Sequence, residues 1–342
     1  MCASRTTDCG FRSNCRTMQI FRSIAEFPQA ANTVAAIGNF DGVHRGHQQI
    51  IVRVRERAQT LGAQAIAVTF DPHPLALLRP EQAPKLITPI PQRLRLLAQT
   101  GIDATVVLPF TRDFSLQSAR EFAEGCLCAA LRVVEVHEGD TFRFGHGAAA
   151  GIVELRKLGE ELGFGVVSHA ALTVRGVTVS SSEVRRRIAA GQLSMARALL
   201  GRPFSILSTP VHGRGVGKQL TTPTINLAPY NELLPPDGVY VTQLRIGEGA
   251  DAPVLNAVTN AGSRPTFDGA GFAIESHLLD GPPPVVLAEA TPIEVCFLAQ
   301  LRQERRFPSP EALKEQILRD VRQAQRYFRR LRSERNSISL NP

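Results

Sequence analysis

The first half of the chain alternates short apolar runs with segments in which apolar residues recur every three or four positions. The short runs are typical of buried strands, and the longer period is typical of amphipathic helices. Helices are expected over residues 92–99, 119–130 and 153–162, among the strand-like runs VAAI, AIAVTF, ATVVLPF, VVEV and GVVSHAAL. This alternation predicts an α/β domain with a parallel, Rossmann-like sheet that binds ligands at the carboxyl ends of its strands.

The pattern changes after about Gly201, where Pro and Gly become frequent and short extended runs replace helices. The runs GVYVTQLRI, VLNAVTN, FAIESHLL and IEVCFL predict a small antiparallel β-barrel or sandwich. A final helix is expected over about residues 309–331, because its apolar residues fall on one side and its charges on the other. Those apolar residues are Leu313, Ile317, Val321 and Phe328.

The 342 residues suit two domains, and the patterns give their bounds. We expect a first domain over 18–186, a helical bridge over 187–200, a second domain over 201–335 and a tail over 336–342. Residues 1–17 lack the apolar core of a secretory signal, and Met18 begins a strand-like segment. We interpret 1–17 as a disordered extension or a wrong start, which N-terminal sequencing of native protein would settle.

Composition narrows the class of protein. Hydrophobic residues make up 43% of the chain, yet no uninterrupted apolar run approaches the roughly 18 residues of a membrane span. The formal charge of +8 is compatible with nucleic acid, a membrane surface or small anionic ligands as partners, and composition does not choose among them. Six cysteines, at positions 2, 9, 15, 126, 128 and 296, show no spacing typical of a disulfide framework, so we expect a reducing cytoplasm.

The segment GNFDGVHRGH, residues 38–47, follows the run VAAI and leads into a helical pattern. His44 and His47 therefore lie three positions apart on the first turn of a predicted helix. Free N–H groups and the helix dipole attract anions there, and two imidazoles add donors for a leaving pyrophosphate. A surface pair or half a metal site remains an alternative, although no nearby Cys or His completes a usual zinc set.

A second candidate anion site is VSSSEVR. Ser180, Ser181 and Ser182 precede a predicted helix there, and the guanidinium of Arg185 adds N–H donors that can bind an anion through two hydrogen bonds. The alternative is that the serines only cap the helix. In the second half, GRGVGK (213–218), PTIN (223–226) and Glu275 offer a Gly-rich turn, polar oxygens and a carboxylate. Phosphorylating an alcohol needs a base and a bound magnesium, but each of these pieces alone also suits an ordinary turn or edge strand.

Together, GNFDGVHRGH, TFDPHP and VSSSEVR resemble signatures of the bacterial bifunctional riboflavin kinase/FMN adenylyltransferases, also called FAD synthetases. The resemblance implies a Rossmann-like nucleotidylyltransferase domain that adenylylates FMN to FAD with pyrophosphate release. It implies catalysis by His44 and His47, and a flavin-binding role for His73 and Thr141. The residues that it implies for ATP phosphate binding are Gly38, Asn39, Phe40, Ser180, Ser181, Ser182 and Arg185.

The segments PTIN, PPDGVY, NAGSRPTF and FAIESHLLD similarly resemble the riboflavin kinase domain of this family. The resemblance implies that Glu275 is the catalytic base, and that Thr224 and Asn226 bind magnesium and ATP phosphate. Gly213, Gly217 and Lys218 are implied in ATP binding. The expected partners are riboflavin, FMN, FAD and ATP with Mg²⁺, and neither a membrane nor nucleic acid is expected. The oligomeric state is left open.

The chain departs from the family pattern at several positions, including one at each site. Thr141 stands where Asp or Asn is usual, with Asp140 one residue earlier, and Thr221 stands where Gly is usual. One alternative is therefore that only one activity is retained. Another is a regulator that binds flavin or nucleic acid without catalysis, motivated by the arginines of 319–335, for which a solvated helix is the favoured interpretation.

Overall fold

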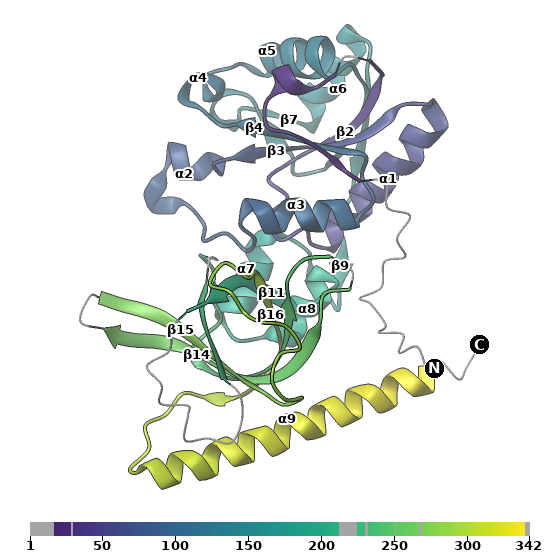
Figure 1. Ribbon diagram of the computed structural model, residues 1–342. Coiled ribbons are helices and arrows are strands. Elements are labelled where there is room, and N and C mark those ends of the chain that lie inside the picture. The colour runs from purple at the N-terminus through teal and green to yellow at the C-terminus, as the bar shows by residue number, and fades with distance from the viewer. Residues whose placement is uncertain are drawn as a thin grey trace. The chain divides into compact units, whose positions relative to one another are not determined.

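The computed structural model describes residues 17–28, 30–211, 224–229, 232–249, 251–266 and 269–338. The expectation for residues 1–17 thus falls almost entirely outside the described residues. By its internal contacts the chain divides into two compact units, with the division after Glu183. Each unit contains one of the two expected sheets (Figure 1).

The first unit contains a six-stranded parallel sheet in the order β1-β4-β3-β2-β5-β8. Its strands are β1 (Gln19–Phe21), β2 (Thr33–Ile37), β3 (Gln64–Asp71), β4 (Ala104–Pro109), β5 (Val133–Gly139) and β8 (Gly165–His169). This architecture confirms the Rossmann-like prediction. The strand order reverses between β2 and β5, so a crevice is expected at the carboxyl ends of these two strands.

Helices cover both faces of this sheet (Figure 1). They are α1 (Arg45–Leu61), α2 (Pro74–Leu78), α3 (Ile90–Gln99), α4 (Arg112–Ser115), α5 (Ala119–Glu121) and α6 (Ile152–Leu162), with the 3₁₀ turns η1 (Ile24–Glu26), η2 (Pro80–Gln82) and η4 (His146–Ala148). Two short hairpins pair β6 (Arg143–Phe144) with β7 (Ala150–Gly151), and β9 (Thr173–Val174) with β10 (Val177–Thr178).

The sequence of strand β2 is continuously apolar from Val34 to Ile37 and does not alternate between apolar and polar residues, because both of its faces are buried. Val34 and Ala36 belong to the core on the α1 face, whereas Ala35 and Ile37 belong to the core on the other face. A strand buried on both faces reads as a continuous apolar run. The helix expected over 119–130 is only partly α-helical, because η3 (Phe122–Ala130) is π-helical and ends with the Leu131 N–H donating to the Cys126 carbonyl.

The second unit contains a closed antiparallel barrel in the order β11-β12-β15-β14-β13-β16, which confirms the barrel prediction. Its strands are β11 (Phe204–Pro210), β12 (Thr224–Pro229), β13 (Gly238–Ile246), β14 (Val254–Thr266), β15 (Gly269–Leu278) and β16 (Ile293–Gln303). The expected bridge contains two helices, α7 (Ser181–Ala189) and α8 (Leu193–Leu200), and the division between the units falls within α7.

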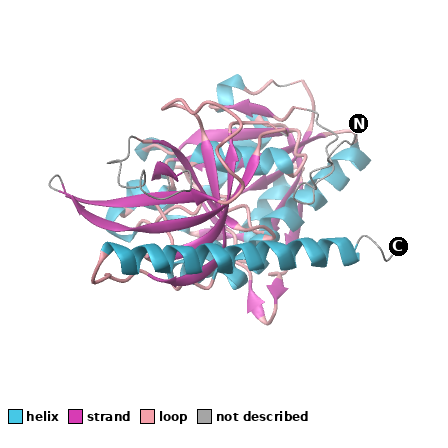
Figure 2. Ribbon diagram, turned by 60° about the horizontal axis from the view of Figure 1, so that its bottom comes forward, coloured by secondary structure: helices cyan, strands magenta, loops and turns pink. Residues whose placement is uncertain are grey.

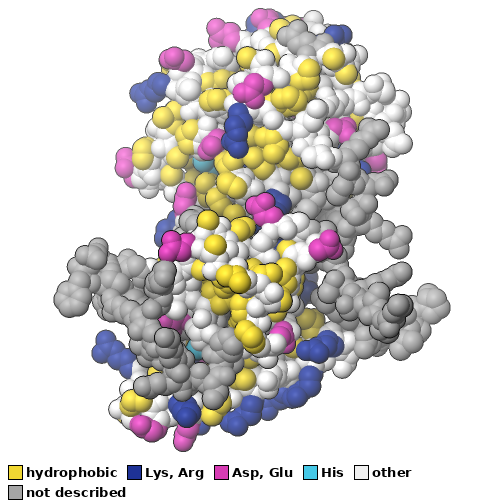
Figure 3. Space-filling model, in the orientation of Figure 1, with side chains coloured by type: hydrophobic (Ala, Val, Ile, Leu, Met, Phe, Trp, Pro, Cys, Tyr) yellow, Lys and Arg dark blue, Asp and Glu magenta, His cyan; other side chains and the backbone are white. Residues whose placement is uncertain are grey.

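Helix α9 (Pro310–Ile338) lies along the outside of the barrel (Figure 2). Ala324 and Phe328 pack there against Val239, Val241 and Val258. Lys and Arg side chains gather in dark blue along the lower edge of the molecule in Figure 3. The exposed arginines of α9 include Arg319, Arg322, Arg326, Arg329, Arg330 and Arg332. Among the described residues, we find no helix with the length and apolar character of a membrane span.

Candidate active sites

Helix α1 begins directly after His44, as the sequence predicts. The His44 Nδ1 accepts a hydrogen bond from the His47 backbone N–H at 3.3 Å, so the imidazole itself caps the helix. The rings of His44 and His47 stack with centroids 3.6 Å apart. Gly46 lies between them, and a Cβ there would come within 3.3 Å of the His44 ring. The segment therefore presents two imidazoles on one turn.

The loop before α1 has an unusual backbone. Phe40 and Val43 have φ angles of 46° and 38°, a left-handed conformation that side chains disfavour, and Gly42 between them has φ 79°. Each such non-Gly residue costs on the order of 1–3 kcal/mol unless its surroundings fix it. Strain of this kind concentrates at ligand sites, which agrees with the prediction for this loop.

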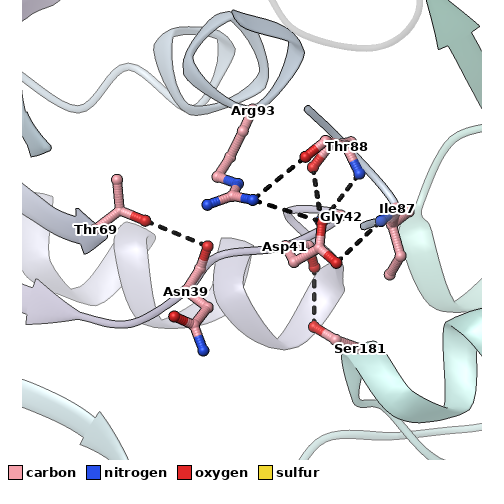
Figure 4. A network of polar contacts seen from close by, with 8 residues as sticks. All are labelled: Asn39, Asp41, Gly42, Thr69, Ile87, Thr88, Arg93 and Ser181. Carbon is pink, nitrogen blue, oxygen red and sulfur yellow. Dashed lines mark hydrogen bonds and ion pairs between the residues drawn. The ribbon is translucent and has the colours of Figure 1, made fainter. Parts of the chain in front are cut away.

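The Asp41 carboxylate fixes the loop (Figure 4). It is 1% exposed and accepts hydrogen bonds from the Ile87 N–H, the Thr88 N–H and the Thr88 hydroxyl at 2.9–3.1 Å. The equally buried Arg93 guanidinium lies 3.9 Å from the same carboxylate. The sequence analysis missed this residue, because its partners lie 46 and 47 positions away.

The serine segment joins the same loop. The Ser181 hydroxyl donates to the Asp41 backbone carbonyl at 2.9 Å (Figure 4). The Ser180 hydroxyl accepts from the Glu183 N–H at 3.2 Å and so caps α7, as the alternative interpretation of these serines states. Capping and ligand binding do not exclude each other here, because Ser180 and Ser181 also line a cavity together with His44 and His47.

That cavity has a volume of about 600 Å³ and opens at the switch point between β2 and β5. Besides the two histidines and two serines, the predicted residues that line it are Gly38, Asn39, Phe40 and Thr141. His73, Ser182 and Arg185 are not among its lining residues. His73 instead caps α2, where its Nδ1 accepts from the Leu75 N–H at 3.2 Å. Arg185 belongs to the second unit.

Two polar groups in the cavity wall are buried. Burial, helped by His44 and Arg93, holds the pKa of His47 well below its usual range, so this imidazole is neutral at pH 7. The His47 Nδ1 and the Asn39 Oδ1 have no hydrogen-bond partner among the described residues. Such atoms are expensive to bury in an empty protein, and a bound ligand or its water shell would satisfy them.

One arm of the cavity is aromatic. Phe70, Phe110 and Phe114 contact each other with centroids 5.6–6.0 Å apart, at the ends of β3 and β4. They line the cavity together with Phe122, Phe142 and Phe144. An arm of this composition suits a flat aromatic ring system.

Glu138 also lines the cavity, and the sequence analysis missed it. The side chain is 5% exposed, and its Oε1 accepts from the Ile37 N–H. Burial raises the pKa of this carboxyl well above its usual range, which the hydrogen bond only partly opposes. The folded protein therefore favours the neutral acid form of this group.

In the barrel, strand register brings the second set of predicted residues together. Glu275 on β15 pairs with Asn226 on β12 and with Asn260 on β14. Directly paired residues point to the same face of a sheet. The neighbouring Ser276 is fully buried inside the barrel, so the row of Asn226, Glu275 and Asn260 faces outward.

Thr224 lies two residues before Asn226 on the same face and pairs with His277. The Thr224 Oγ1 and the His277 Nδ1 are 2.9 Å apart. Burial lowers the pKa of His277, so the ring is neutral and its Nδ1 can accept a hydrogen bond from the Thr224 hydroxyl. The Asn260 Oδ1 is buried and has no hydrogen-bond partner among the described residues. Neutral oxygens beside a carboxylate suit Mg²⁺.

Comparison with known proteins decides the family. A model described as FAD synthetase matches residues 26–183, and a model described as riboflavin kinase matches residues 200–328. The "Bifunctional riboflavin kinase/FMN adenylyltransferase" of Escherichia coli (strain K12) is 36% identical over 314 residues, which cover 91% of this chain and 98% of that protein. The protein of the same name from Pseudomonas fluorescens is 38% identical over 306 residues, covering 89% and 96%.

The chain belongs to the bifunctional riboflavin kinase/FMN adenylyltransferase family. The resemblance stated from the motifs is thereby confirmed. A solved structure titled "Crystal Structure of Macrolide-efflux Protein from Streptococcus pneumoniae" has a TM-score of 0.78 and covers 90% of this chain and 98% of its own. At 23% identity that likeness shows a shared fold alone.

The two family sites account for most of the predicted residues. Gly213, Gly217 and Lys218 lie outside the described residues, as does the Thr221 departure. Asn260 and His277 were missed as site residues, although Asn260 opens the NAGSRPTF segment that carries part of the resemblance to the family. Their spacing from Glu275 carries no local signal, because only strand pairing brings them beside it.

Proposed function

We propose that this chain phosphorylates riboflavin to FMN in its barrel unit and adenylylates FMN to FAD in its parallel-sheet unit, with MgATP as the donor in both reactions. Membership of the family and the presence of both domains support the pair of activities. The observation that carries the proposal is the cavity at the switch point, where both nucleotidylyltransferase signatures meet.

In adenylyl transfer, a phosphate oxygen of FMN attacks the α-phosphorus of ATP, and the bond to the bridging oxygen of pyrophosphate breaks. No general base is needed, because the attacking phosphate is already anionic. His44 and His47 hold N–H donors toward the departing pyrophosphate at the start of α1, where the helix dipole also favours negative charge. Ser180 and Ser181, which line the same cavity, supply hydroxyls beside this loop.

Thr141 lies in the cavity wall, at the position where the resemblance to the family implies Asp or Asn. We infer that its hydroxyl still donates or accepts one hydrogen bond, so that adenylyl transfer survives the departure. Asp140 lines the same wall one residue earlier and keeps a carboxylate in the cavity.

In the kinase reaction, the 5′-hydroxyl of the ribityl chain attacks the γ-phosphorus of ATP, and ADP leaves. Glu275 takes the hydroxyl proton, since it is the carboxylate in the row of polar residues on the outer barrel face. Thr224 and Asn226 would hold Mg²⁺, whose charge offsets that of the triphosphate when it is bound. No cluster of three acidic, His or Cys ligands occurs among the described residues, which agrees with a metal bound mainly through substrate phosphate.

The test measures the two half-reactions separately on the full chain. Riboflavin with MgATP should give FMN and ADP, and FMN with MgATP should give FAD and pyrophosphate. Glu275→Gln should lower only the first rate, by about 10²–10⁴-fold. His44→Ala should lower only the second, by about 10²–10³-fold. Each variant is the folding control for the other. A half-reaction missing from the folded wild-type protein would refute that activity, and an unchanged rate in either variant would remove that residue from its role.

A further inference from the structure

A chain of polar side chains runs through the first unit and ends in the cavity. The Arg57 guanidinium on α1 donates two hydrogen bonds of 2.8 Å to the Glu135 carboxylate on β5. The same carboxylate lies 2.7 Å from the His137 Nε2, and the His137 Nδ1 lies 3.0 Å from the His169 Nε2. His169 ends β8 and lines the cavity. The adenylyl-transfer proposal assigns no role to any of these four residues.

The chemistry of the chain sets the direction of each hydrogen bond. Hydrogen bonds from Arg57 hold the pKa of Glu135 at about 2, so this group is an anion and only accepts. His137 therefore donates from Nε2, and in its neutral form its Nδ1 accepts from the Nε2–H of His169. Burial and the neighbouring His137 lower the pKa of His169, which keeps that ring neutral. The remaining nitrogen of His169, Nδ1, is then a hydrogen-bond acceptor with its orientation fixed.

The position of His169 indicates what it would accept from. The phosphate groups of both substrates are expected near the start of α1, so the two ring systems extend to either side of the switch point. The arm beside β3 and β4 is walled by phenylalanines and suits the large flavin ring. At the end of β8 the cavity is lined by His169 and the aliphatic residues Ala170, Ala171 and Leu172, a less aromatic wall that suits the smaller adenosine.

We propose that His169 is a specificity-determining residue for the nucleotide, whose imidazole accepts a hydrogen bond from the adenosine of ATP, through either the base amine or a ribose hydroxyl. His137 and Glu135 are positioning residues that fix its tautomer and orientation. This inference rests on the proposed adenylyl transfer and adds to it a residue that selects the nucleoside.

The first experiment varies ATP at saturating FMN in the full chain. His169→Ala removes one neutral hydrogen bond to ATP, so it should raise the KM for ATP about 3- to 10-fold. The kcat and the KM for FMN should stay unchanged. His169→Asn keeps an acceptor oxygen and should recover part of the loss. His137→Phe leaves His169 in place but removes its orienting partner, so it should raise the same KM without changing kcat. An unchanged kcat for FAD formation reports that the first unit of each variant is folded.

The second experiment identifies the donor with ITP, 2′-deoxy-ATP and 3′-deoxy-ATP. ITP lacks the base amine, and each deoxy analogue lacks one hydroxyl. The penalty of His169→Ala should disappear for one of the three and persist for the other two. An equal penalty for all three, an unchanged KM for ATP, or an effect on the KM for FMN would overturn the inference. If wild-type protein forms no FAD, the proposed function itself fails; if His169 has no effect in an active enzyme, only the inference fails.

Discussion

Replacing Asp41 with alanine tests whether one buried carboxylate holds the strained phosphate loop. The substitution removes the acceptor for two buried backbone N–H groups and the anion beside the buried Arg93. Each orphaned N–H costs about 1–3 kcal/mol, and breaking a buried ion pair costs about 3–5 kcal/mol. Relaxation of the strained residues Phe40 and Val43 returns part of this energy. We expect a net loss of about 3–5 kcal/mol in the stability of the first unit.

The same relaxation should move His44 away from its position at the start of α1. A displacement of about 1 Å at a catalytic group can cost about 10²-fold in rate. We therefore expect Asp41→Ala to lower FAD formation from FMN at least about 100-fold, while FMN formation in the barrel unit remains. The chain contains no tryptophan, so stability is best measured by amide hydrogen exchange in β2 and β3.

Asp103→Ala is the matched control. The Asp103 carboxylate accepts from the Ala65 N–H at 2.9 Å, beside the amino ends of β3 and β4, and does not line the cavity. Its loss should reduce the stability of the first unit by about 1–3 kcal/mol and leave the rate of FAD formation at saturating substrate unchanged. If Asp41→Ala keeps its rate within about 3-fold, or if Asp103→Ala loses as much, the loop is not held in the way described.

Two further predictions concern the cavity wall. Because the pKa of Glu138 is raised, the native state keeps a proton that the unfolded chain loses above about pH 4.5. The free energy of unfolding of the wild-type protein therefore falls as pH rises toward the folded pKa, by up to about 1.4 kcal/mol per pH unit. Glu138→Gln keeps the acceptor for the Ile37 N–H, so its stability should exceed that of wild type by a margin that grows from pH 5 to pH 7. Urea unfolding at each pH would measure this margin. A stability difference independent of pH would contradict the assigned protonation. The second prediction concerns Gly145, which has φ 75° and where a Cβ would lie 2.8 Å from the Ala119 backbone nitrogen. Gly145→Ala should therefore lower the stability of the first unit by about 1–3 kcal/mol. It should also reduce the rate of FAD formation more than that of FMN formation. Equal rates in wild type and variant would show that the wall tolerates this change.

Local patterns predicted the parts of the molecule that depend on neighbours in sequence. The apolar run before Gly38 predicted a strand, and the periodicity after His44 predicted a helix. Together they placed two imidazoles at the carboxyl end of a parallel strand, where the cavity lies. The strand that carries Glu275 was predicted from the run FAIESHLL, whereas the role of its carboxylate followed from the family resemblance.

The remaining site residues depend on contacts between segments that are distant in the sequence, and such contacts give no signal in the local sequence pattern. Asp41 gains its role from Ile87 and Thr88, and His169 gains its role from β5. His73 followed the family motif, yet in the structure its ring caps α2 outside the lining of the cavity. The protonation of Glu138 depends on burial, which its place between His137 and Gly139 in the sequence does not reveal.

The most direct test of the account is a time course of the purified full chain with riboflavin and MgATP, with riboflavin, FMN and FAD separated at each point. We predict that riboflavin falls, FMN rises first, and FAD follows with one pyrophosphate released per FAD. Folded protein that forms no FMN, or that accumulates FMN and never forms FAD even when FMN is supplied, would contradict the claim that this chain contains both active sites.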